Sequence, residues 1–466
     1  MKNHGFALLL VVLVAIAEGV YLYNLNAGYW WDEAVYLGLA RGIYQGGGYY
    51  IMEPPVESFR PPLFPHVIAG VWLLAGMSEE AAKALPIIFG VLSVVLAYFV
   101  AKELFSEEAG LISAALLATS SILLLHEARV LTETLFIFLL LCFVYTYHRA
   151  MKTGNASLFI LSGIIMGLAF LARYTAVLLW VAYLAYPLLI KRKGFNVKGF
   201  ISGLAVSALM LLPWLLIAQA YYGSPVELLS VQAGTVDGRY YQGEWHFYFL
   251  NWMDIFGMAG VFALPGLAVL LSKRRGENVW IALLFLLSLL FFILLPRKET
   301  RYLLNFYPVF LLVMSLGISY MIRSSVHRKI AAGFVMLLLA SGLFAGIAQA
   351  DAASQADTAL KSAGLWLRDS APEGSAIMSQ NYPVLHYMTG RKVVAFPENE
   401  EGFHDEIGSH TVSYIVIETA EPTYPNYVFD SDSTEKKPAG VFDGFGLAGT
   451  FSDKGNTVWI YKTNRG

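Results

Sequence analysis

Charge and cysteine are what this sequence has least of. Only 14% of its 466 residues are charged, and it contains a single cysteine, Cys142. Soluble domains carry about 25% charged residues, so a water-facing globule is excluded. One cysteine also excludes disulfide scaffolds, Cys-based zinc sites and iron–sulfur clusters. With 57% hydrophobic residues and a mean hydropathy of +0.57, the composition predicts a polytopic membrane protein.

The few charges are distributed unevenly. Residues 1–350 hold 23 Lys and Arg against 18 Asp and Glu, a balance of +5. Residues 351–466 hold 9 against 16, a balance of −7. This division predicts a membrane domain over 1–350, with its first outer loop at 24–84, and a soluble domain over 351–466. In the latter, a helix at 358–369, short β runs at 376–379, 392–396 and 414–418, and a hairpin at 447–461 predict an α/β fold.

Long apolar runs dominate the first 350 residues. A spanning helix needs roughly 17 to 25 apolar residues. About eleven runs meet this need, at 6–23, 85–104, 110–125, 134–147, 158–172, 175–190, 200–222, 256–272, 279–295, 302–322 and 330–350. A twelfth, at 63–77, is shorter and contains Pro65 and His66, so we expect it not to span. A cleaved signal peptide at 6–23 is the alternative for the first run, but Glu18 interrupts it and no Ala-x-Ala site follows.

Three basic clusters set the predicted orientation in the plasma membrane, because positive loops favour the cytoplasmic side. Counting crossings back from them places the loops at 24–84, 126–133, 223–254 and 296–301, and the domain at 351–466, outside the cell. The clusters are Lys191 to Lys193 with Lys198, Lys273 to Arg275, and Arg323 with Arg328 and Lys329.

The first outer loop carries two adjacent carboxylates, Asp32 and Glu33, directly after Trp30 and Trp31. Tryptophan is common at membrane interfaces, where charge is unusual. One interpretation is structural, with Asp32 capping a helix over 34–44. The other is chemical, with the carboxylates acting as a general base or holding a metal. The sequence pattern leaves both open.

Basic residues accumulate in the loops predicted to lie outside, against the orientation bias. In the loop at 126–133, four ionisable groups lie within eight residues. Charges snorkelling at helix ends are the structural alternative. An anionic ligand explains the excess better, because arginine geometry suits phosphate oxygens. The nine basic residues are Arg41, Arg60, Lys83, Arg129, Arg173, Arg239, Arg297, Lys298 and Arg301.

Taken in order, these motifs resemble the GT-C membrane glycosyltransferases. Within that superfamily the chain is similar to relatives of the dolichyl-phosphate-mannose protein mannosyltransferases and of the lipid A aminoarabinose transferases. The resemblance covers most of residues 20–320. It is carried by Asp32-Glu33 with Tyr36, Arg60-Pro61-Pro62-Leu63, Arg129 with Glu133, the stretch from Gly167 to Arg173, and Arg301-Tyr302-Leu303-Leu304 with Pro308.

The resemblance implies a glycosyltransferase that takes a sugar from a polyprenyl phosphate, dolichyl or undecaprenyl, and transfers it to an acceptor hydroxyl on a protein, glycan or lipid. Membrane lipids are then partners and nucleic acid is not. Its implied residues are the catalytic Asp32 and Glu33; Arg60, Arg129, Arg173, Lys298, Arg301 and Tyr302 for the donor phosphate; and Tyr36, Glu53, Glu127, Glu133 and His246 for sugar or acceptor. No cofactor is required by the resemblance, and a divalent metal on Asp32 and Glu133 is left open.

The chain also departs from the aminoarabinose transferases. Val35 stands where they carry Arg, Arg60 and Arg173 where they carry Lys, and Glu133 where Asp is commoner. These departures concern the sugar and acceptor more than the reaction. Two other classes remain: a secondary transporter, although no repeated halves are visible, and a non-catalytic sensor, which leaves the outer basic residues unexplained.

The predicted orientation is tested by cysteine accessibility. A protein with Cys142→Ala and Gly46→Cys contains one thiol, in the first loop. We expect a membrane-impermeant maleimide to label it in intact cells. Labelling only after the cytoplasmic side is opened would reverse the predicted topology.

Overall fold

The computed structural model describes residues 4–25, 28–52, 59–189, 195–227, 230–231, 243–273, 275–355, 358–409, 412–421, 423–430, 436–453 and 455–463. Glu53, Arg239 and the basic cluster at 191–193 lie outside these residues. The chain divides into two compact units. The first comprises residues 1–24 and 59–350, and the second comprises 25–58 and 351–466.

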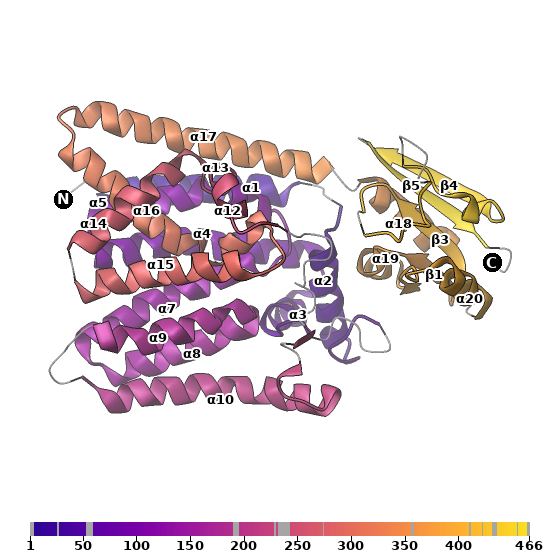
Figure 1. Cartoon of the computed structure of the whole chain (residues 1–466), viewed down its shortest axis with the longest axis horizontal. Coiled ribbons are helices and arrows are strands. Elements are labelled where there is room, and N and C mark those ends of the chain that lie inside the picture. The colour runs from indigo at the N-terminus through magenta and orange to yellow at the C-terminus, as the bar shows by residue number, and fades with distance from the viewer. Residues whose placement is uncertain are drawn as a thin grey trace. The chain divides into compact units, whose positions relative to one another are not determined.

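The first unit is a bundle of apolar helices that run side by side (Figure 1). Within the described residues, eight helical segments are long and apolar enough to cross a membrane. Their helices are α1 (His4–Tyr23), α4 (Glu79–Leu104), α7 (Glu133–Thr153), α10 (Val197–Tyr222), α13 (Trp252–Phe256) continued by η2 (Gly257–Phe262) and α14 (Ala263–Ser272), α15 (Gly276–Leu294), η3 (Thr300–Phe306) continued by α16 (Tyr307–Ser324), and α17 (Arg328–Gln355).

Fewer helices of the described residues are long enough to span a membrane than the eleven that the sequence predicts. The run at 110–125 is broken into α5 (Glu107–Ala118) and α6 (Ser121–Glu127), which meet at 54°, so it counts as a ninth span only if the bent pair is one. The runs at 158–172 and 175–190 form shorter helices, α8 (Ala156–Ala172) and η1 (Tyr174–Ala176) with α9 (Val177–Leu189). The doubtful run at 63–77 forms the short helix α3 (Leu63–Ala75).

Glycines bring α8 and α10 into close contact. A Cβ on Gly163 would lie 2.0 Å from the carbonyl oxygen of Gly203, and one on Gly203 would lie 2.4 Å from the carbonyl oxygen of Phe159. Small residues allow this approach, and van der Waals packing then replaces the hydrophobic drive that lipid cannot supply.

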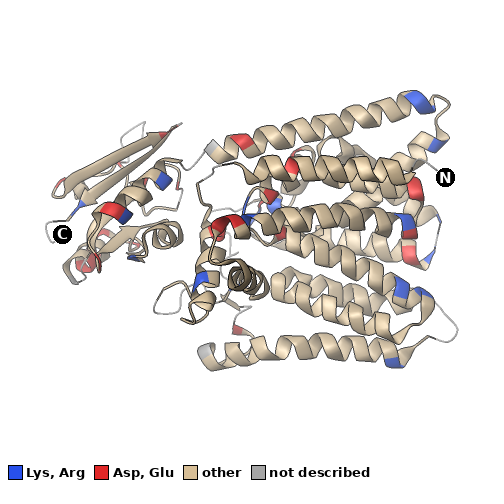
Figure 2. Cartoon of the chain, turned by 180° about the vertical axis from the view of Figure 1, so that it is seen from behind, with Lys and Arg blue, Asp and Glu red and all other residues tan. Residues whose placement is uncertain are grey.

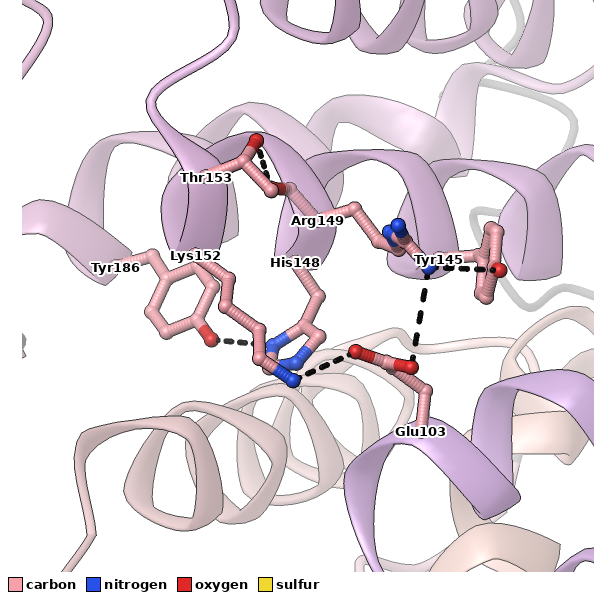
Figure 3. Close-up of polar contacts among 7 residues, drawn as sticks. All are labelled: Glu103, Tyr145, His148, Arg149, Lys152, Thr153 and Tyr186. Carbon is pink, nitrogen blue, oxygen red and sulfur yellow. Dashed lines mark hydrogen bonds and ion pairs between the residues drawn. The ribbon is translucent and has the colours of Figure 1, made fainter.

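Charged residues of this unit lie mostly toward the two ends of its helices (Figure 2). Figure 3 shows the end where α7 finishes. There, Glu103 of α4 accepts a hydrogen bond from Lys152 at 2.8 Å and lies 4.0 Å from Arg149, both on α7. His148 of α7 bonds through Nδ1 to the Tyr186 hydroxyl of α9 at 2.7 Å. These contacts tie three helices together at the end opposite Glu133, which begins α7.

The second unit contains a five-stranded sheet of order β2-β1-β3-β5-β4. Its strands are β1 (Ala376–Ser379), β2 (Lys392–Val394), β3 (Val412–Glu418), β4 (Gly446–Asp453) and β5 (Asn456–Lys462). The pairs β1–β2 and β1–β3 are parallel, while β3–β5 and β4–β5 are antiparallel. The sequence-based strands and the hairpin are confirmed.

Helices cover both faces of this sheet, which explains why β1 is buried throughout. On one face lie α18 (Thr358–Ser370) and α19 (Tyr382–Thr389), with Trp366 against the Tyr414 ring at 6.2 Å. On the other, Phe403 of α20 (Glu400–Ser409) packs in a core with Ile415 and Ile417. The other helices given for the described residues are α2 (Trp31–Tyr44), α12 (Phe247–Leu250) and the short η4 (Gly440–Phe442).

The glycine contact makes a testable claim about packing. Gly163→Leu should lower the midpoint of thermal unfolding in detergent markedly, because its side chain would meet the α10 backbone. Gly333→Leu is the matched control, since a Cβ at Gly333 in α17 meets nothing within 4 Å. Equal stability of the two variants would contradict the α8–α10 contact.

Candidate active site

A buried ion pair anchors one end of the first unit. Glu133 is only 2% exposed, and its Oε1 lies 2.9 Å from a terminal nitrogen of Arg173. The same nitrogen donates to the Thr132 hydroxyl at 2.8 Å. Arg173 reaches this position because it ends α8 in an extended conformation, with φ of −153°. A buried carboxylate needs such a partner, since desolvating an isolated charge is very costly.

A chain of hydrogen bonds links the neighbourhood of Arg173 to that of Arg60. The hydroxyl of Tyr174 donates to the carbonyl oxygen of Phe59 at 2.8 Å and accepts from Trp214 at 3.0 Å. The Arg60 guanidinium lies 5.4 Å from the Phe59 ring centroid. Two arginines that are far apart in sequence are therefore held at the same end of the unit.

A second charge cluster precedes α16. The Glu299 carboxylate bonds to the Nε of Arg297 at 2.6 Å and to the Nε of Arg301 at 2.5 Å. All three side chains are partly buried. Tyr302, the next residue, is buried, with its ring 6.3 Å from that of Phe292. Glu299 was not singled out from the sequence. An acidic residue with an arginine two positions before it and another two positions after it is a pattern that could have indicated these ion pairs.

The loop between α6 and α7 connects these clusters. His126 is buried and interacts electrostatically with Glu133, Arg173 and Arg301. Arg129, in the same loop, is 2% exposed. His126 therefore lies near Glu133 and near arginines of two other loops, Arg173 and Arg301.

Other predicted residues have different surroundings. Lys298 is buried, and its ammonium donates to the carbonyl oxygens of Phe292, Ile293 and Leu295 at the end of α15. Burial lowers the pKa of Lys298. Because three acceptors match the three donors of an ammonium, its local role is to cap α15.

Glu127 and His246 also have surroundings that differ from those of the arginines. A Cβ on Gly90 of α4 would lie 1.9 Å from Glu127 Oε1, so the carboxylate packs against that helix, and it interacts with Glu18 of α1. His246 is partly exposed, and its ring lies 5.5 Å from that of Trp245. Tyr248, beside it, is buried, and its ring centroid lies 6.0 Å from the Lys298 ammonium.

The acidic pair belongs to the second unit. Helix α2 begins at Trp31, with Trp30 as its N-cap, so the interpretation of Asp32 as the N-cap is wrong. Glu33 caps the helix instead: it is 3% exposed and accepts a bond from the Trp30 backbone N–H at 3.3 Å. Asp32 is more exposed than Glu33, while Tyr36 is buried.

Helix α2 packs on the soluble domain. The Arg41 guanidinium donates to the Tyr387 carbonyl oxygen at 3.0 Å and lies 4.2 Å from the Tyr387 ring centroid. Trp31 meets Tyr382 edge to face at 4.6 Å. Val35 and Leu39 complete this contact with Ile51. Arg41 thus joins α2 to α19.

Within the described residues, no three His, Cys, Asp or Glu side chains converge as metal ligands. Asp32 and Glu133, the pair considered for a metal, belong to different units.

A protein-family model matches part of this sequence. Residues 59–217 match the family model described as dolichyl-phosphate-mannose-protein mannosyltransferase. This match, together with the fold that the chain shares with solved structures, confirms the resemblance to the GT-C membrane glycosyltransferases. The matched region contains Arg60, Arg129, Glu133 and Arg173. No curated protein sequence matches the chain.

Solved structures share this fold at low identity. ArnT from Cupriavidus metallidurans bound to undecaprenyl phosphate has a TM-score of 0.71 and 13% identity, and the match covers 99% of this chain and 98% of ArnT. The Archaeoglobus fulgidus oligosaccharyltransferase tethered with an acceptor peptide has a TM-score of 0.68 and 15% identity, covering 90% and 69%. AglB from the same organism, with an inhibitory peptide and dolichol-phosphate, has 0.65 and 15%, covering 89% and 70%.

The buried ion pair predicts a large difference between two glutamates. Glu133→Gln leaves Arg173 without its buried partner and should destabilise the protein by about 3–5 kcal/mol. Glu103→Gln is the control, because its partner Lys152 is 61% exposed, and such pairs contribute about 0–1 kcal/mol.

Thermal unfolding in one detergent compares the two variants with the parent. Adding Arg173→Met to Glu133→Gln should recover much of the lost stability, since no buried charge then remains unpaired. Similar unfolding midpoints for the two single variants would contradict the buried pair.

Proposed function

We propose that this protein transfers a sugar from a polyprenyl-phosphate donor to an acceptor hydroxyl on the outer side of the membrane. The observation that carries the proposal is the gathering of arginines at one end of an apolar helical unit. Five arginines of this end accompany two glutamates that pair with them, an excess of cations that suits an anionic group. The arginines are Arg60, Arg129, Arg173, Arg297 and Arg301, and the glutamates are Glu133 and Glu299.

The ion pairs favour phosphate binding by orienting the guanidinium groups. A guanidinium carries five N–H donors, more than one carboxylate uses. Glu133 therefore fixes Arg173, and Glu299 fixes Arg301, without exhausting the donors of either arginine. Phosphate oxygens accept charge-assisted bonds from such preset donors. We assign phosphate binding to Arg60, Arg173 and Arg301, with Arg129 and Tyr302 supporting it.

A lipid-linked donor also fits the location. A polyprenyl chain partitions into the bilayer, so its phosphate lies at a membrane surface, where the helix ends of a spanning bundle lie. Solved structures of the same fold contain dolichol-phosphate and undecaprenyl phosphate. These ligands support the donor class proposed here.

The proposed reaction is a single displacement at the anomeric carbon. The acceptor oxygen forms a bond to that carbon as the bond to the phosphate oxygen breaks, and the bonding electrons leave with the phosphate. Asp32 removes the acceptor proton as general base. The arginines stabilise the charge that grows on the leaving phosphate. Glu33, whose carboxylate caps its own helix, positions Asp32, while Tyr36, Glu53, Glu133 and His246 remain candidates for sugar or acceptor contacts.

The phosphate assignment predicts a difference between two lipids. Parent protein in nanodiscs should bind undecaprenyl phosphate more tightly than undecaprenol, because only the former engages the arginines. Arg301→Gln should reduce this preference at least about tenfold, the loss of one charge-assisted bond. Arg323→Gln is the matched control, since Arg323 lies at the other end of α16 and pairs with Glu108. Equal binding of both lipids by the parent would contradict the assignment.

The base assignment predicts loss of turnover. With a radiolabelled polyprenyl-phosphate sugar and cell-envelope acceptors, Asp32→Asn should lower transfer by about 10²–10⁴-fold. Donor binding should stay near the parent value. Full transfer by Asp32→Asn would remove Asp32 from the proposed mechanism.

A further inference from the structure

The parallel strands of the second unit contain a topological switch point. After β1 the chain passes through α19 to β2 on one side, and after β3 it continues toward β4 and β5 on the other. In open α/β sheets, ligands bind beyond the carboxyl ends of two such neighbouring strands. Strand β1 ends at Ser379, and strand β3 ends at Glu418. Ser379 pairs with Val416, which lies two residues before Glu418.

Polar side chains occupy this position. Asn381, two residues after β1, donates from Nδ2 to Glu418 Oε1 at 3.1 Å. Gln380 donates from Nε2 to the Thr423 carbonyl oxygen at 3.3 Å. Glu418 is 2% exposed and Ser379 is fully buried. A buried carboxylate thus lies beside two carboxamides at the place where the sheet topology opens.

Two acceptors in this group remain unsatisfied. Gln380 Oε1 and Asn381 Oδ1 are buried and have no hydrogen-bond partner in the part of the chain that the structure describes. Leaving a buried polar atom unpaired costs about 1–3 kcal/mol, so each such atom requires a reason. Both residues are themselves partly exposed, so a ligand at the surface can approach them.

The chemistry of these atoms selects a ligand class. The two amide oxygens and the Glu418 carboxylate are acceptors, so a complementary ligand brings hydroxyl donors. The Glu418 carboxylate repels an anionic ligand. The ammonium of Lys436 does not offset this repulsion, because it is engaged by the Thr419 carbonyl oxygen at 2.9 Å. A neutral, hydroxyl-rich ligand fits this set better than a phosphate.

An aromatic pair adds the second half of a sugar site. Tyr382 follows Asn381 directly and meets Trp31 of α2 edge to face. Ligand sites commonly combine aromatic surface with a few convergent polar groups, and a pyranose offers apolar C–H faces together with hydroxyls. Asp32, the proposed base, is the next residue after Trp31.

We propose that Gln380, Asn381 and Glu418, with Tyr382 and Trp31, form a binding site for a neutral glycan. Its identification as the acceptor rests on the proposed function, whereas glycan binding by itself does not. Through this site the soluble domain holds the sugar acceptor beside the helix that carries Asp32.

The proposal is tested by glycan binding to the full chain in nanodiscs. The probes are neutral oligosaccharides of mannose, glucose, galactose and N-acetylglucosamine, followed by saturation-transfer NMR and calorimetric titration. At least one should bind saturably. Gln380→Leu should weaken that binding about tenfold or more. It should change the unfolding midpoint little, because the lost bond to the Thr423 carbonyl oxygen is offset by the removal of an unsatisfied buried oxygen. Gln45→Leu, at an exposed glutamine of the same unit, should bind as the parent does.

Three results would overturn the proposal: no oligosaccharide binds the parent, Gln380→Leu binds as the parent does, or a Ser/Thr-rich peptide binds where oligosaccharides do not. Asp32→Asn should retain glycan binding, so a failed transfer mechanism and a failed glycan site are distinguishable. In a transfer assay, Gln380→Leu should raise the acceptor KM with little change in kcat.

Discussion

The pairing of partly buried arginines with glutamates is the constraint on which the membrane unit depends. Charge at the end of an apolar bundle is costly unless it is paired and hydrogen-bonded. Glu133 satisfies Arg173 across α7 and α8, and Glu299 satisfies Arg297 and Arg301 before α16. The first pair joins the start of α7 to the end of α8, and the other two order the segment before α16. They also preset guanidinium groups for an anion, so one interaction serves stability and the proposed chemistry.

Polarity and the positions of the apolar helices were predictable from the sequence because they depend on local composition. Apolar runs located the candidate spans, and the charge change at residue 351 marked the start of the segment that forms the sheet of the second unit. The bend between α5 and α6 was not predictable, since it depends on packing rather than on hydropathy. The short helices α8 and α9 show the same limit: both are apolar, but neither has the length of a full span.

The sequence predicted which kinds of residue form the candidate site better than it predicted what each residue does there. Arginines in outer loops signalled an anion site, and several of them lie together. Lys298 carried the same signal, yet it caps α15, because carbonyl oxygens at a helix end compete for an ammonium. Glu127 packs against Gly90 instead of joining the arginines. Gln380 and Asn381 gave no signal, since their position depends on strand order, which a sequence pattern does not reveal.

The central claim is that the arginine cluster binds a lipid-linked phosphate. The most direct measurement is an experimental structure of the protein in nanodiscs with undecaprenyl phosphate. We expect phosphate density within hydrogen-bond distance of Arg173 and Arg301. Phosphate bound at the opposite helix ends, near Lys152 or Arg323, or density with no arginine contact, would contradict it.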